Sequence, residues 1–246
     1  MAVKIGAPPR AARAIVLIDQ RRTGASNALD CSPAGRVDDA QSYLGEMFPE
    51  DLIAQCAASV AAHADLTRYK TMDVVEDLEE LRNRLGYDVV DLYGTSYGTR
   101  VALAYLERHP QRVRAMILKG VVEPQSVVPS SFAEDTERAL RLTIEDCAAD
   151  PQCSNDYPDL AAAYTKLRAT LDNGPIATDL TVGERKQRVT LSRGVIAATF
   201  RSALQATPFA ARLPRVIHAA AHGDYAPLAA FVVEVRKAGE GAVRRG

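Results

Sequence analysis

The pentapeptide Gly94-Thr95-Ser96-Tyr97-Gly98 constrains the fold more than any other segment of this 246-residue chain. The mostly apolar and β-branched residues 88–93 before it predict a buried strand, and residues 99–106 after it predict a helix. In so tight a turn, a side chain at Gly94 or at Gly98 is expected to strike the neighbouring backbone. The sequence therefore predicts Ser96 in a strained conformation, with its hydroxyl exposed above the end of the strand.

A serine presented on such a bend is typical of enzymes that attack a carbonyl carbon through the serine oxygen. The sequence predicts Ser96 as the nucleophile, Gly94 and Gly98 as the elbow glycines, and the Tyr97 backbone N–H as an oxyanion donor. A serine hydroxyl is a weak nucleophile at neutral pH, so a histidine must accept its proton and a carboxylate must orient that histidine.

Composition excludes several other classes of protein. The chain has 30 basic and 31 acidic residues and a net charge of −1, which gives no indication of a nucleic-acid groove. No apolar run reaches membrane-spanning length, and the first ten residues lack the apolar core of a signal peptide. We expect no nucleic-acid partner, no membrane segment and no signal peptide in this chain.

The four cysteines of the chain indicate the cellular compartment in which the protein acts. Cys147 and Cys153 bracket a turn that suits a local disulfide, which would leave Cys31 and Cys56 to each other. Two disulfides favour an oxidising, secreted or periplasmic location, whereas four buried thiols would fit the cytoplasm. The cysteines lack zinc-site spacing, and we expect no metal and no cofactor.

The chain divides into two halves by pattern. Residues 1–122 alternate strand and helix signals, with strands expected at 14–18, 88–93 and 113–118, which indicates a parallel α/β sheet. Residues 123–246 show helical patterns, and Arg188-Val189-Thr190 is their only candidate strand. The fold class predicted is therefore α/β, with an incomplete parallel core and an all-helical cap or lid.

Linked motifs carry a family resemblance over residues 15–228. Three segments are similar to the α/β-hydrolase branch of proline iminopeptidases and bacterial tripeptidyl aminopeptidases. They are the elbow with its preceding Tyr93, the loop Asp19-Gln20-Arg21-Arg22-Thr23-Gly24-Ala25-Ser26 and the segment His222-Gly223-Asp224-Tyr225. Two positions depart from that branch, which has glycine at Arg22 and usually aspartate at Lys119.

The resemblance implies a metal-independent aminopeptidase or esterase acting on small peptides or esters. It also implies an acid and a histidine on later strands, and a second oxyanion loop on an earlier one. None of these segments is recognisable, so the chain looks truncated at both ends and impaired activity is expected. An oligomer or a complementing chain would supply the missing groups. The alternative is a non-catalytic binding domain or truncated product that keeps a substrate pocket.

The histidines of the sequence do not identify the catalytic base. His63 precedes the elbow, and His109 lies about 20 Å from Ser96 along the expected helix, at ~1.5 Å per residue. His222 and His218 remain as candidate bases on a cap helix, against the simpler interpretation of an amphipathic helix. Their spacing of four also allows metal chelation with Asp224, although no clear third ligand stands nearby.

Overall fold

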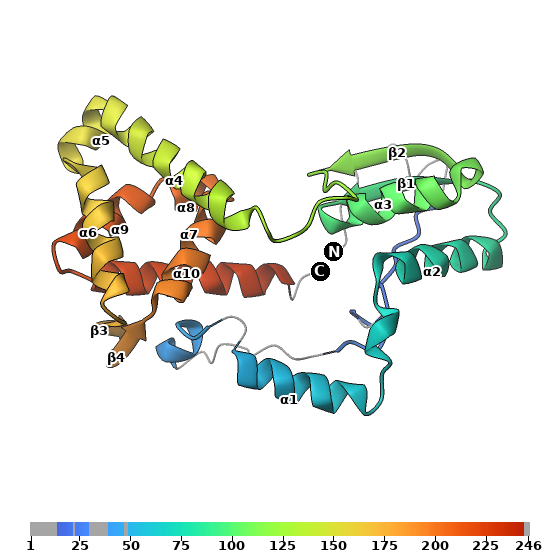
Figure 1. Ribbon diagram of the computed structural model, residues 1–246, viewed down its shortest axis with the longest axis horizontal. Helices are drawn as coiled ribbons and strands as arrows, with labels where there is room; N and C mark the ends of the chain where they lie inside the picture. The colour runs from blue at the N-terminus through green and yellow to red at the C-terminus, as the bar shows by residue number, and fades with distance from the viewer. Residues whose placement is uncertain (1–13, 22, 30–38, 47–48, 244–246) are drawn as a thin grey trace. The chain divides into compact units, whose positions relative to one another are not determined.

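The computed structural model describes residues 14–21, 23–29, 39–46 and 49–243, and the chain forms two compact units (Figure 1). The first, which we call the mixed unit, comprises residues 2–31 and 50–128. The second, the helical unit, comprises residues 32–49 and 129–246. Of the segment 32–49, the described residues 39–46 and 49 group with the C-terminal half, and the division after residue 122 stays a prediction.

The mixed unit contains a short pair of parallel strands, with helices before the first strand and between the two strands. Its elements are α1 (Glu50–Ala61), η3 (Leu66–Arg68), α2 (Thr71–Arg84), β1 (Val90–Thr95), α3 (Tyr97–Arg108), η4 (Pro110–Arg112) and β2 (Val113–Lys119). Strands β1 and β2 pair in parallel, in a register that ends with Thr95 opposite Lys119. Because parallel neighbours need a crossover, α3 connects the two strands and packs on them.

A small apolar core joins α2 to α3. Val74 and Val75 of α2 are buried against Val101 and Tyr105 of α3. Leu85, which caps the C-terminal end of α2, is exposed. Gly86 follows with φ +73°, as expected for the glycine just after a helix end.

The strand predicted over residues 14–18 does not form. Residues 14–20 have no strand assignment, and their apolar side chains are exposed, Leu17 by 65%. A strand is stabilised by its ladder and by apolar cover, and β1 and β2 pair only with each other among the described residues. The apolar pattern was correct for a strand, but the partner it needs is absent from the described residues.

The helical unit is larger and has most of the buried apolar residues. Its elements are η2 (Ala40–Tyr43), α4 (Phe132–Ala149), α5 (Pro151–Asp156), α6 (Leu160–Asp172), β3 (Ile176–Val182), β4 (Arg185–Leu191), α7 (Arg193–Leu204), α8 (Thr207–Ala210), α9 (Leu213–Ala221) and α10 (Ala226–Val243). Leu167, Leu213, Ile217 and Phe231 are among its fully buried side chains. Figure 1 shows α4 and α10 as the two long helices of this unit.

An antiparallel hairpin, β3 with β4, corrects the expectation of an all-helical cap, and β4 contains the candidate strand Arg188-Val189-Thr190. Its strands pair from Ile176 opposite Leu191 to Val182 opposite Arg185, and Gly183 at the turn has φ +62°. Leu180, Val189 and Leu191 are buried while polar residues between them face outward. The many charged residues on the outward face hid this alternation in the sequence.

A proline marks the boundary between two short helices, α8 and α9. The structure has α8 and α9 separated at Ala211 and Arg212, with Pro214 in the first turn of α9. Proline lacks the N–H that a helix interior needs, and it fits the first turn, where that N–H has no intrahelical partner.

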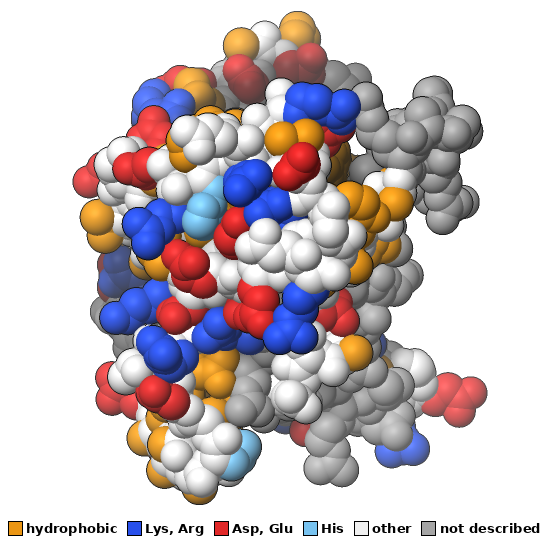
Figure 2. Space-filling view, turned by 90° about the vertical axis from the view of Figure 1, so that its right-hand side faces the viewer, with side chains coloured by type: hydrophobic (Ala, Val, Ile, Leu, Met, Phe, Trp, Pro, Cys, Tyr) orange, Lys and Arg blue, Asp and Glu red, His pale blue; other side chains and the backbone are white. Residues whose placement is uncertain are grey.

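The Cys147–Cys153 disulfide forms as expected and links the last turn of α4 to α5, with its Cα atoms 5.1 Å apart. Cys31, the partner predicted for Cys56, lies outside the described residues. Of the helices in the described part of the chain, none combines the length and the apolar character needed to cross a bilayer. On the face drawn in Figure 2, basic and acidic side chains are interspersed.

A buried charge network connects three elements of the mixed unit. Arg82, only 6% exposed, donates two hydrogen bonds to the Glu79 carboxylate, at 2.9 and 2.7 Å, and others to the Tyr87 and Asp88 carbonyls. The Tyr105 hydroxyl donates to Glu79 at 2.6 Å. The Arg82 guanidinium is the main cause that lowers the pKa of Glu79 to about 2.

This network predicts an acid-sensitive contribution to stability. Because the folded pKa of Glu79 lies below its ordinary value of 4.5, its contribution is complete above pH 4.5 and is lost as pH falls toward 2. Glu79→Gln should reduce the loss of unfolding free energy between pH 5 and about pH 3, measured by urea denaturation. The control is Glu80→Gln, since Glu80 pairs with Arg84 at the exposed surface. Equal pH dependence in wild type and Glu79→Gln would contradict the assignment.

Candidate active site

Ser96 lies on a sharp bend between β1 and α3. Its backbone has φ 53° and ψ −122°, a region that L-residues other than glycine rarely adopt. Thr95 ends the strand before it, Tyr97 begins the helix after it, and the Ser96 side chain is exposed. The strand–serine–helix order expected from the pentapeptide is thus the order observed.

The two glycines of the pentapeptide have different roles. A Cβ atom at Gly94 would lie 2.5 Å from the Gly98 carbonyl oxygen and 2.9 Å from the Thr99 Cα. A Cβ atom at Gly98 would meet no heavy atom within 4 Å. The steric requirement predicted for both positions therefore holds at Gly94 and is wrong at Gly98, because the close approach runs from the strand to the helix backbone and needs only one small residue.

Three hydrogen bonds hold the bend. The Ser96 amide donates to the Lys119 carbonyl at 2.9 Å, which continues the β1–β2 ladder into the turn. The fully buried Thr99 hydroxyl donates to the Ser96 carbonyl at 2.6 Å and accepts from the Val122 amide at 2.8 Å. The sequence analysis did not predict this role for Thr99. Its position in the first turn of the helix could have indicated it, because a hydroxyl there can donate to the carbonyl of the residue that caps the helix.

Tyr97 is the first residue of α3, so its N–H has no carbonyl four residues earlier within the helix. The partial positive charge at a helix N-terminus favours a developing negative charge at this position. The Tyr97 ring is 42% exposed, and its hydroxyl lies 3.1 Å from the Thr71 hydroxyl at the start of α2.

The loop after residue 18 is stabilised by its own polar contacts. The Asp19 carboxylate accepts from the Ala25 amide at 2.9 Å, and a Cβ atom at Gly24 would clash with that carboxylate at 2.4 Å. Arg21 donates to both carboxylate oxygens of Asp77 on α2, at 2.7 and 2.5 Å. These contacts brace the loop. Arg22 lies outside the described residues.

The histidines are divided between the units. His63 is exposed after α1, and His109 caps α3 with its ring 5.1 Å from that of Tyr105 and its Nε2 buried. His218 on α9 and His222 at its end both belong to the helical unit. Within the described part of the mixed unit, the Ser96 hydroxyl has no hydrogen-bond partner.

His218 and His222 contact each other. Their ring centroids are 4.3 Å apart, and the Nδ1 of His222 lies 2.7 Å from the His218 carbonyl oxygen. Because a carbonyl only accepts, Nδ1 carries the proton, and Nε2 of a neutral His222 is left with a free lone pair. Among the described residues, no three His, Cys, Asp or Glu side chains group closely enough to hold a metal ion.

Comparison with known proteins identifies the family. The sequence profile of the alpha/beta hydrolase fold matches residues 8–215. The chain belongs to this family, and its two-stranded parallel sheet with the elbow serine is part of an α/β-hydrolase fold.

Individual relatives match over shorter segments. The serine protease Hip1 of Mycobacterium tuberculosis (strain H37Rv) is 40% identical over 91 residues, which are 36% of this chain and 18% of that protein. The proline iminopeptidase of Xylella fastidiosa (strain 9a5c) is 41% identical over 86 residues, which are 35% of this chain and 26% of that protein. The chain therefore spans at most about a quarter of the length of these curated relatives.

The glycine geometry makes a matched pair of substitutions informative. Gly94→Ala forces the strand away from the α3 backbone and should lower the free energy of unfolding by about 1–3 kcal/mol. Gly98→Ala adds a methyl group into open space within a helix and should be neutral or stabilising by up to ~1 kcal/mol. Urea denaturation of both variants measures the difference. Equal destabilisation would show that the contact at Gly94 does not define the bend.

Proposed function

We propose that this protein is a serine hydrolase that cleaves peptide or ester bonds through nucleophilic attack by Ser96. The observation that carries the proposal is the exposed Ser96 hydroxyl on a positive-φ bend at the end of β1, in a chain of the α/β-hydrolase family. Strain of this kind persists only where the surrounding structure enforces it, and it is concentrated at functional sites.

In the proposed reaction, the Ser96 oxygen attacks the substrate carbonyl carbon while its proton passes to a base. The carbonyl oxygen gains negative charge and accepts a hydrogen bond from the Tyr97 N–H at the start of α3. The base then protonates the leaving amine or alcohol, and water releases the acyl group.

Two histidines are our candidates for the base. His222 is the stronger one, because its Nδ1–H is anchored on the His218 carbonyl and its Nε2 is free to accept a proton. His218 contributes the anchoring carbonyl through its backbone, so its ring is less directly involved. An imidazole from a complementing chain or a further segment is the alternative source.

The names of the relatives support a peptide substrate. Proteins named proline iminopeptidase and serine protease share about 40% identity with this chain over short segments. We propose an aminopeptidase acting on short peptides, with simple esters as further substrates. The Cys147–Cys153 disulfide supports action in an oxidising compartment, outside the cell or in the periplasm.

A second candidate function is binding without turnover. It is favoured by the absence of a hydrogen-bond partner for the Ser96 hydroxyl in the described part of the mixed unit. A domain of this kind would hold a peptide without activating the serine. Covalent labelling distinguishes the two functions, because an unassisted serine does not react with a fluorophosphonate.

Ser96→Ala tests the nucleophile. The change should abolish fluorophosphonate labelling and hydrolysis of a nitrophenyl ester, because it removes the only atom proposed to form the acyl bond. The matched control is Ser131→Ala, since Ser131 is exposed and its side chain does not cap α4. Ester hydrolysis that survives in Ser96→Ala would disprove the proposed role, and a wild type that never labels would favour the binding function.

His222→Gln tests the base. Loss of a general base should slow labelling of Ser96 by roughly 10²–10⁴-fold. His218→Gln is the comparison, because it retains the backbone carbonyl that anchors His222 and should have little effect if His222 is the base. A loss of labelling in His218→Gln alone would move the role of base to His218. Unchanged labelling in His222→Gln would assign the base to another histidine, in this chain or in a partner.

A further inference from the structure

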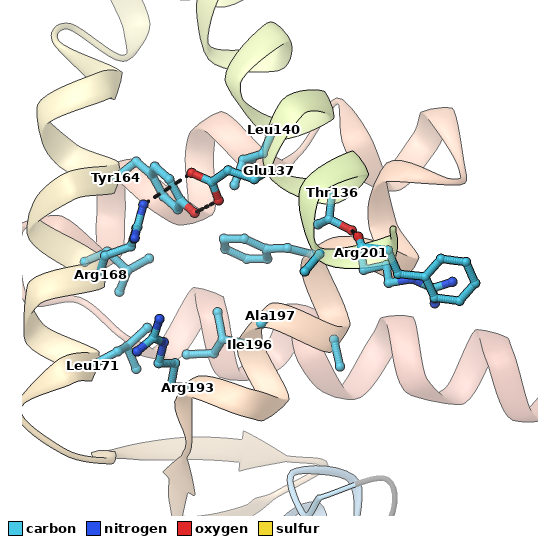
Figure 3. A pocket seen from close by; sticks show the side chains of 15 residues that line it. Thr136, Glu137, Leu140, Tyr164, Arg168, Leu171, Arg193, Ile196, Ala197 and Arg201 are labelled. Carbon is cyan, nitrogen blue, oxygen red and sulfur yellow. Dashed lines mark hydrogen bonds and ion pairs between the residues drawn. The ribbon is translucent and has the colours of Figure 1, made fainter. Parts of the chain in front are cut away.

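The helical unit has a cavity, partly open to solvent, that the hydrolase proposal does not use. It has a volume of about 410 Å³ and lies between α4, α6 and α7, within the range of small-molecule sites (Figure 3). Its buried wall is apolar and consists of Leu140, Leu167, Leu171, Ile196 and Phe200. Such a wall fits the hydrophobic body of a ligand.

The polar groups of the cavity are mostly cationic. Arg168, Arg193 and Arg201 line it together with a single carboxylate, Glu137. Figure 3 shows Arg168 and Arg193 on one side and Arg201 on the opposite side. The charge at the cavity therefore favours an anion over a cation.

The carboxylate is already engaged. Glu137 accepts a hydrogen bond from the Tyr164 hydroxyl at 3.0 Å and one from Arg168 at 3.2 Å. Burial and the nearby Glu137 charge raise the pKa of Tyr164 to about 12, so its hydroxyl remains a donor. Arg193 is paired in turn with Asp172 at 2.7 Å.

Arg201 differs from the other two arginines. Its guanidinium carbon lies 3.9 Å from the centroid of the Phe132 ring, and among the described residues it has no carboxylate partner. An aromatic face orients a guanidinium but accepts none of its in-plane N–H bonds. The Arg201 guanidinium is thus a preoriented cation beside an apolar cavity, and its N–H groups are available to donate hydrogen bonds to a ligand.

We propose that this cavity binds a small amphipathic acid, with its anionic head at Arg201 and its apolar body against the wall formed by α4, α6 and α7. A fatty acid and the free carboxyl end of a hydrophobic peptide both have this chemistry. The proposal does not depend on the role of Ser96.

Calorimetric titration of the full chain with three probes of one length tests the charge requirement. Octanoate should bind, whereas octanol and octylammonium should bind at least about tenfold more weakly, because they lack a partner for Arg201. N-acetyl-Leu-Leu with a free carboxyl group, compared with its amide, distinguishes the peptide source from the fatty-acid source. Octanol binding as tightly as octanoate would overturn the proposal.

Substitutions locate the site. Arg201→Gln should weaken octanoate binding roughly 10- to 100-fold, and Arg201→Lys should restore part of it, because the charge returns without the fork of donors. Arg141→Gln is the matched control, since Arg141 lies on α4 outside the cavity and pairs with Glu145. Ala197→Trp should fill the cavity and abolish binding, with circular dichroism confirming that the variant folds. Octanoate affinity unchanged in Arg201→Gln or in a folded Ala197→Trp would place binding elsewhere and refute the proposal.

Discussion

The hydrogen bond from the Ser96 amide to the Lys119 carbonyl is the contact on which the candidate site depends. It extends the β1–β2 ladder by one residue, so the chain leaves the sheet only at the serine itself. Thr99 then fixes the Ser96 carbonyl from the helix side. With its amide tied to the sheet and its carbonyl tied to α3, Ser96 has no freedom to relax its positive φ, and the hydroxyl is directed outward.

Helix α2 supports this site from behind. Asp77 holds Arg21 and with it the loop after residue 18, while Arg82 holds the carbonyls of Tyr87 and Asp88 that precede β1. Tyr105 of α3 joins the same network through Glu79. Helix α2 thus positions the loop, β1 and α3 through charged side chains. These side chains are paired with one another, and a buried arginine is tolerated only when it is paired in this way.

Local sequence patterns predicted local structure, but they did not predict the pairing of segments that are far apart in the sequence. The Cys147–Cys153 bridge depends on residues close in sequence and was predicted. The bend at Ser96 was predicted from its pentapeptide, although the Lys119 carbonyl and the Val122 amide that help to hold it come from later in the chain. The strand over residues 14–18 was predicted wrongly, because its formation depends on a neighbour that the segment itself does not encode. The cavity beside Arg201 was invisible to the sequence, since its wall comes from three helices whose packing no single periodicity reveals.

The uncovered apolar residues of the mixed unit have a practical consequence. Leu17, Ile117 and Val127 are each more than half exposed, and the β1–β2 pair has two open edges among the described residues. Unpaired strand edges beside exposed aliphatic side chains are templates for intermolecular β-pairing. At the concentrations used for purification, self-association through this unit would compete with the dispersed form, which low protein concentration or a mild solubilising agent would preserve.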